Sequence, residues 1–112
     1  MNWKPIPRFE GKYFIVEDGQ ICNRRYQILK TTFNPSNGYV NANLSINGKH
    51  IRPLVHRLVL ETFVGPCPAH HATNHKDGNK TNNRLDNLEW ITFGDNQRHR
   101  HRILGKRQTS QS

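Results

Sequence analysis

The supply of apolar side chains limits what this chain can fold into more than any other feature. Only 33% of its 112 residues are hydrophobic, and adding its 8 glycines still leaves it below the ~45–50% that is usual in globular domains. Such a chain can build one small domain with a thin core. We therefore exclude two separate catalytic domains and expect a ligand or partner to help stabilise the fold.

Positive charge dominates the polar residues. The chain has 17 Lys and Arg against 8 Asp and Glu, a formal net charge of +9. Five of the basic residues and no acidic one lie in the last fifteen positions, and the preceding body is basic as well. A surface of this kind neutralises phosphates and releases their counterions. Nucleic acid is the predicted partner.

The sequence offers no support for a membrane or a zinc site. No apolar run is long enough to span a bilayer, and the N-terminus lacks the apolar stretch of a signal peptide, so we expect a cytoplasmic protein without a membrane partner. Cys22 and Cys67 are far apart, which fits a reducing compartment. Cys67, His70 and His71 do not complete a set of four ligands, and zinc is therefore not expected.

The first half of the chain has the pattern of β-structure. Short apolar runs at 13–16, 21–22 and 26–29 alternate with turn residues and predict a small antiparallel meander. Apolar and polar residues then alternate over 39–46. The Asn47-Gly48 pair should turn this strand back into residues 50–52 as a hairpin with a type I′ turn.

One segment changes to the period of a helix. Apolar or small residues recur at helical spacing, at Val55, Leu58, Val59, Thr62 and Phe63. Gly65-Pro66 should stop the helix, so we predict it over 54–64. His56 and Arg57 fall outside this apolar face, and the pattern gives neither of them a role.

The second half reads as strand, polar loop, strand and helix. After an irregular stretch at 66–73, Asn74-His75 leads into a turn-rich loop at 77–83, and 88–92 alternates like a strand. Thr92 should cap a helix that runs from about residue 93 to 104. This order brings His75, Asn87 and Asn96 toward one another.

Several motifs at fixed spacing resemble the HNH nucleases of phages and mobile introns, which belong to the ββα-metal superfamily. They are VHRLV at 55–59, NHKDGNK at 74–80, NNR at 82–84, NLEWIT at 87–92, and Asn96. Residues 3–21 are similar to the small module that precedes HNH domains in homing endonucleases. The resemblance implies an α+β fold, with an N-terminal antiparallel β-rich, DNA-contacting module at 1–53 and a ββα-metal core at 54–104. The polar and basic residues at 105–112 are expected to form a disordered tail.

The resemblance assigns two residues to the reaction. His75 matches the general base, and a near-neutral imidazole can take a proton from water at physiological pH. Asn87 matches the central Asn, whose inferred task is to tie the loop and to orient His75 through hydrogen bonds. A simple turn-capping role for Asn87 stays open. Asp77 lies near His75 in sequence, but an Asp-Gly pair first of all indicates a turn.

Asn74 and Asn96 match the metal positions of the family. Amide oxygens suit one hard divalent ion, Mg²⁺ or Mn²⁺, which keeps open sites for phosphate oxygens. Relatives often carry Asp or His at the first position, and Asn74 cannot supply the negative charge of Asp. We therefore expect weak metal binding by the free protein and strong coupling between metal and DNA.

The resulting prediction is a metal-dependent, homing-type DNA endonuclease that acts as a monomer or weak dimer on double-stranded DNA and nicks one strand. The alternative is a non-catalytic DNA-binding protein on an HNH scaffold. The family resemblance also points to a bacterial host cell and a gene that a phage could encode. The expected DNA contacts are basic residues around the loop and on the last helix: Arg52, Arg57, Lys76, Lys80, Arg84, Arg98, Arg100 and Arg102.

Overall fold

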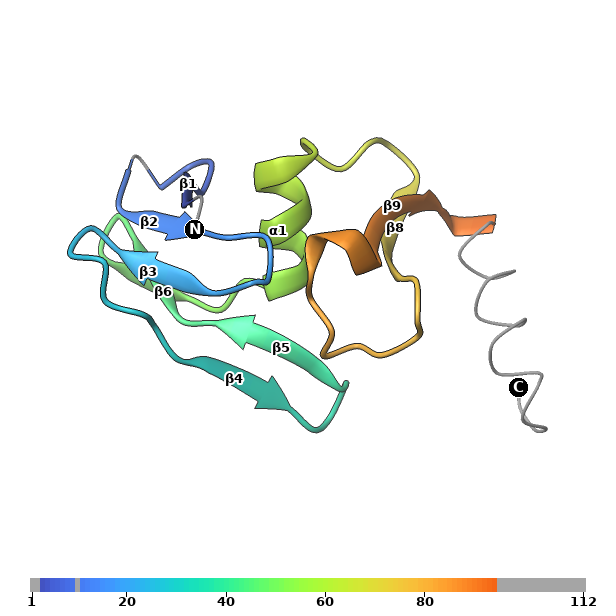
Figure 1. Cartoon of the computed structure of the whole chain (residues 1–112), viewed down its shortest axis with the longest axis horizontal. Coiled ribbons are helices and arrows are strands. Elements are labelled where there is room, and N and C mark those ends of the chain that lie inside the picture. The colour runs from blue at the N-terminus through green and yellow to red at the C-terminus, as the bar shows by residue number, and fades with distance from the viewer. Residues whose placement is uncertain (1–2, 10, 95–112) are drawn as a thin grey trace.

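The helix predicted from the apolar stripe lies at the centre of the structure. The computed structural model describes residues 3–9 and 11–94. Helix α1, Val55–Phe63, stands between the N-terminal strands on one side and a β-hairpin on the other (Figure 1). The helix ends as expected, because the N–H groups of Val64 and Gly65 both donate to the carbonyl oxygen of Leu60. The fold is α+β.

Short antiparallel strands form the N-terminal half. One sheet has three strands, and two further pairs follow it. The sheet contains β1 (Lys4–Pro5), β2 (Tyr13–Ile15) and β3 (Ile21–Asn23), and the pairs are β4 (Thr31–Asn34) with β5 (Tyr39–Ala42) and β6 (Leu44–Ile46) with β7 (Lys49–Ile51). The Asn47-Gly48 hairpin is confirmed, with φ of 51° and 77° as a type I′ turn requires.

Two strand predictions need correction. The third meander strand, at 26–29, is shorter than predicted: Asn23 Oδ1 accepts hydrogen bonds from the N–H groups of Arg25 and Gln27 and holds a turn before it, while the N–H of Leu29 still donates to the carbonyl oxygen of Ile21. Only Ile28 keeps a bridge, to Cys22. The predicted strand at 39–46 is interrupted at Asn43, so its first part pairs with β4, which the sequence pattern did not indicate, and its second part pairs with β7.

The second half contains the hairpin that carries the family motifs. Strand β8 (His71–His75) pairs with β9 (Leu88–Thr92), and a short 3-10 turn, η1 (Leu85–Asn87), precedes β9. Part of the stretch expected to be irregular is therefore strand, because β9 supplies its hydrogen-bond partners. Residues 93 and 94 begin a helix as predicted. The remainder of the predicted segment, to residue 104, lies outside the described residues.

One apolar cluster joins the two halves of the chain. It includes Ile15 and Ile21 from the first sheet, Leu58 from α1 and Leu88 from β9. Helix α1 contacts strands on both sides, so its buried face serves the N-terminal strands and the hairpin together. The predicted boundary near residue 53 thus falls within a region where both segments share the same core. No helix in the described part of the chain is long and apolar enough to cross a membrane.

Gly19 lies where these halves meet, and its replacement should be costly. Its φ is 93°, and a Cβ there would lie 3.4 Å from the carbonyl oxygen of Asn83 and from a methyl group of Val55. We expect Gly19→Ala to lower the free energy of unfolding in urea by about 1–3 kcal/mol. Gly48→Ala is the control, because it shares the left-handed φ but has open space around it. Equal losses in both variants would show that the contact at Gly19 contributes nothing.

Candidate active site

His75 ends β8 at the start of a tight turn. The N–H of Gly78 donates to the carbonyl oxygen of His75, and Gly78 takes a φ of 78° that suits glycine. The His75 ring is buried, and its Nε2 lies 2.9 Å from Oδ1 of Asn83. Because an amide oxygen only accepts, Nε2 carries the proton and Nδ1 of the neutral ring keeps its lone pair. Nδ1 is therefore the basic atom.

Asn87 and Asp77 close the loop that follows His75. The Asn87 side chain accepts from the N–H of Asp77 and donates to Asp77 Oδ1, each at 3.0 Å, and it also donates to the carbonyl oxygen of Asn82. Asn82 donates to the other carboxylate oxygen of Asp77 at 2.8 Å. The bonds from Asn82, Asn79 and Asn87 lower the pKa of Asp77 and keep it ionised.

In the structure, two residues share the roles that the sequence analysis gave to Asn87 alone. We expected Asn87 to orient His75 by hydrogen bonding, but in the structure Asn83 makes that bond and Asn87 holds the loop. The two asparagines are both buried, four positions apart. The NNR run at 82–84 was a signal for Asn83, and sequence alone does not tell which amide of such a run reaches the ring.

Asn74 lies opposite Glu89 in the hairpin. The register pairs these residues, and Asn74 Nδ2 donates to Glu89 Oε2 at 2.8 Å. The carboxylate thus stands next to the amide that matches the family's metal position, a neighbour that the sequence analysis missed because it follows from the pairing register. Asn74 Oδ1 and the Glu89 carboxylate are hard oxygen donors and suit Mg²⁺ or Mn²⁺. Among the described residues, no three His, Cys, Asp or Glu side chains form a metal-binding group.

His56 is buried against His75, although it was expected off the apolar face. Only 4% of it is exposed, and its ring centroid lies 5.0 Å from those of His75 and Tyr39. Burial, then His75 and Arg57, lower the pKa of His56 from 6.5 to about 3. Burial also lowers the pKa of His75, while Asn83 and Asp77 act to raise it and Lys80 adds to the lowering. Both rings are therefore neutral at physiological pH.

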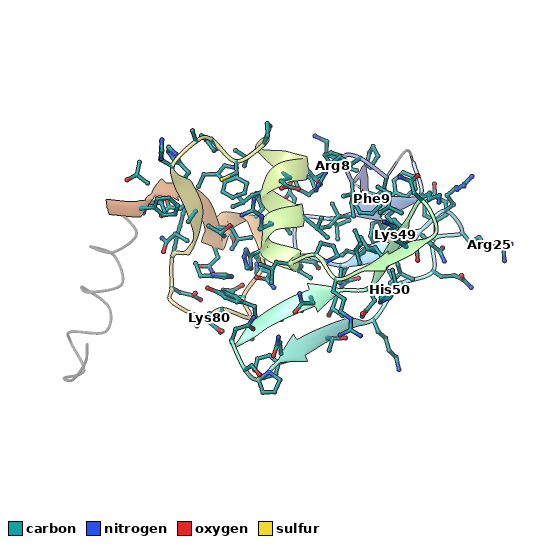
Figure 2. The ribbon with its side chains drawn as sticks, turned by 180° about the vertical axis from the view of Figure 1, so that it is seen from behind. Arg8, Phe9, Arg25, Lys49, His50 and Lys80 are labelled. Carbon is teal, nitrogen blue, oxygen red and sulfur yellow. The ribbon has the colours of Figure 1, made fainter. Side chains whose placement is uncertain are left out.

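Some of the predicted DNA-contacting residues are exposed, and others make contacts within the protein. Arg52, Lys76 and Arg84 are exposed. Lys80 is also exposed but donates to the carbonyl oxygen of Asn37 at 3.1 Å, and Figure 2 shows it beside the loop near β5. The partly exposed Arg57 lies 5.4 Å over the Trp90 ring and 3.8 Å from Glu61. Four predicted residues lie outside the described part of the chain: Asn96, Arg98, Arg100 and Arg102.

Comparison with known families matches this arrangement. A model described as HNH endonuclease matches residues 53–98, and one described as NUMOD4 motif matches residues 1–45. The chain carries an HNH endonuclease domain behind a NUMOD4 motif. The resemblance noted from the sequence is thereby confirmed, and the NUMOD4 motif is the module seen at residues 3–21 and beyond. His75, Asn74, Asn83 and Asn87 all lie within the HNH domain.

Proteins of similar sequence occur in a phage and in a giant virus. DNA endonuclease I-HmuI of Bacillus phage SP01 is 37% identical over 93 residues, which cover 82% of this chain and 53% of that protein. An uncharacterized HNH endonuclease of Acanthamoeba polyphaga mimivirus is 39% identical over 99 residues, or 88% of this chain and 29% of that protein. The chain thus spans about half or less of these relatives.

A solved structure of DNA binding and cleavage by the HNH homing endonuclease I-HmuI has the same fold. Its TM-score to this chain is 0.84 at 33% sequence identity, and the match covers 97% of this chain and 62% of that one. Nearly all of this chain therefore has a counterpart there, from the NUMOD4 motif through the HNH hairpin.

The buried His56 predicts a pH-dependent stability. Its pKa is about 3 in the folded chain and near 6.5 when unfolded, so the unfolded state binds the extra proton between these values. Stability should therefore fall as pH drops from 6.5 toward 3, with a contribution of up to about 1.4 kcal/mol per pH unit. Urea unfolding of wild type and His56→Phe measures this slope. His70→Asn, at an exposed histidine, should keep the wild-type slope, and an unchanged slope in His56→Phe would contradict the prediction.

Proposed function

We propose that this chain is a divalent-metal-dependent DNA endonuclease that nicks one strand of duplex DNA. The observation that carries the proposal is His75, which sits in an HNH domain as a neutral ring whose Nε2–H is engaged by Asn83. A base needs a free lone pair and a fixed ring, and this hydrogen bond provides both. DNA as the substrate follows from the relatives and from the net charge of +9.

In the proposed reaction, His75 Nδ1 takes a proton from the water that attacks the phosphorus atom. Asn83 keeps the ring in the tautomer that this step needs, and the charge of Asp77 stabilises the imidazolium that forms. Asn87 acts through the loop, since it holds Asp77 and the turn after His75 in place. A single site of this kind cuts one strand, so a monomer or weak dimer should produce nicks first.

Asn74 and Asn96 would hold the divalent ion, with Glu89 beside Asn74 adding negative charge. When bound, such an ion neutralises charge on the phosphate and stabilises the leaving 3′ oxygen. Glu89 offsets part of the charge that Asn74 lacks as a neutral amide. The DNA backbone would contact the exposed residues Arg52, Lys76, Lys80 and Arg84. The other proposed DNA contacts are Arg57 and the basic residues 98, 100 and 102.

Supercoiled plasmid tests the reaction directly. With Mg²⁺ or Mn²⁺ we expect conversion to the nicked form, no reaction in EDTA, and a rate at least about a hundredfold lower in His75→Ala, because a positioned base contributes that much. His70→Asn should cleave like wild type, and circular dichroism should show that both variants are folded. A folded protein that binds the plasmid without cutting it in either metal would instead be the non-catalytic DNA-binding protein.

Metal binding can be measured apart from cleavage. In the His75→Ala background, calorimetry should show weak Mn²⁺ binding to the free chain and tighter binding with duplex DNA, because phosphate completes the charge. Glu89→Gln should weaken Mn²⁺ binding while it can still accept from Asn74. Asp86→Asn, at an exposed carboxylate that pairs with Arg84 at 3.6 Å, should not. Tight Mn²⁺ binding without DNA would refute the coupling, and an unchanged Glu89→Gln would remove Glu89 from the site.

A further inference from the structure

Three rings from three separate segments pack together, and one of them is the ring of His75. Tyr39 comes from β5, His56 from α1 and His75 from β8. The Tyr39 ring is roughly parallel to the His75 ring, at 27° and 6.1 Å between centroids, and His56 meets His75 edge-on at 78° and 5.0 Å. Tyr39 also contacts His56 at 5.0 Å. The base is thus packed against two other rings, and one of them belongs to the NUMOD4 motif.

His56 works in this cluster as a packing element. It is buried, and its Nδ1 has no hydrogen-bond partner among the residues that the structure describes. An unpaired buried nitrogen costs free energy, so packing has to hold the ring in place. Tyr39 covers His56 on one side and His75 covers it on another. A change in the position of Tyr39 would therefore reach His75 both directly and through His56.

Lys80 also contacts Tyr39. Its Nζ lies 4.9 Å from the centre of the Tyr39 ring, in a cation–π contact, and donates to the carbonyl oxygen of Asn37 at 3.1 Å. The fit is close, because a Cβ on Gly38 would lie 3.2 Å from the Lys80 side chain. The β4–β5 turn of the NUMOD4 motif is thereby fastened to the loop that follows His75.

The partner of the base is held by the same motif. Asn83, which accepts from His75, packs its backbone against Gly19. Two residues further on, the N–H of Leu85 donates to the carbonyl oxygen of Glu17 at 2.7 Å. Glu17 and Gly19 both lie between β2 and β3, within the NUMOD4 match at 1–45. The hydrogen bond on His75 thus also depends on where the N-terminal strands lie.

From these contacts we infer that the NUMOD4 motif forms one wall of the active site, and that Tyr39 is a positioning residue for His75. The inference rests on the proposed nuclease function. Tyr39 acts through packing: its ring fixes the plane of His75 and holds His56 behind it. The phenolic oxygen has no part in this, so a phenylalanine can take its place.

Cleavage and spectroscopy with the full chain test this role. Tyr39→Leu keeps an apolar side chain without a ring and should slow single-turnover nicking of plasmid at saturating protein about tenfold or more, because a misplaced base is that costly. Tyr39→Phe should restore the rate, and the affinity for DNA should stay the same in both. Phe33→Ala is the control, since Phe33 is an exposed aromatic residue on the neighbouring strand β4.

Proton NMR reports on the rings even if no cleavage occurs. Wild type and Tyr39→Phe should show nuclear Overhauser effects between ring 39 and the rings of His56 and His75, and the His75 ring protons should shift when the ring is lost in Tyr39→Leu. Absent ring-to-ring effects in wild type, or His75 resonances that do not move in Tyr39→Leu, would overturn the inference. The inference would also be overturned if the Tyr39→Leu variant cuts DNA at the wild-type rate, or if it loses only affinity for DNA. If wild type shows these ring contacts but never nicks DNA, the proposed function fails while the packing role stands.

Discussion

Hydrogen bonds between side-chain amides and one carboxylate hold the loop after His75 in shape, and the position of His75 depends on them. The loop between β8 and β9 has almost no apolar residue, so it cannot be fixed by burying a core of its own. Asn87 binds both the backbone and the carboxylate of Asp77, and Asn82 binds the same carboxylate from the other side. Buried amides that find all their partners in this way stiffen a loop much as packing stiffens a core. Loss of the Asp77 carboxylate would leave the buried Asn87 amide without one of its acceptors.

The same shortage of apolar residues explains why the two modules are joined so closely. Helix α1 buries one face toward the N-terminal strands and toward β9 at once, so neither module has a complete core without it. The contacts at Gly19, Glu17 and Tyr39 extend this junction up to His75. The NUMOD4 motif, which occupies a separate stretch of sequence, therefore shares both the core and the candidate active site.

The sequence predicted what local patterns control. The spacing of apolar residues located α1 to within one residue at either end, and Asn47-Gly48 located a hairpin turn, because both depend on neighbours in the chain. It missed the shortening of the third meander strand to one bridge after the Asn23 turn, and the break at Asn43. For the site, motif spacing singled out His75, Asn74 and Asn87. The NNR run pointed to Asn83 without showing which amide reaches the ring. The other partners, Glu89 and Tyr39, come from strand register and tertiary packing, which no local pattern of the sequence encodes.

We propose that His75, backed by the N-terminal module, and an ion beside Asn74 and Glu89 act together on one phosphate. A crystal structure of His75→Ala with duplex DNA and Mn²⁺, with the ion located by anomalous scattering, tests it most directly. We predict the ion beside Asn74, in contact with a phosphate oxygen that faces the position vacated by the His75 ring, with Tyr39 still packed on His56. An ion bound elsewhere, or DNA that crosses the protein without a phosphate near residue 75, would contradict the account.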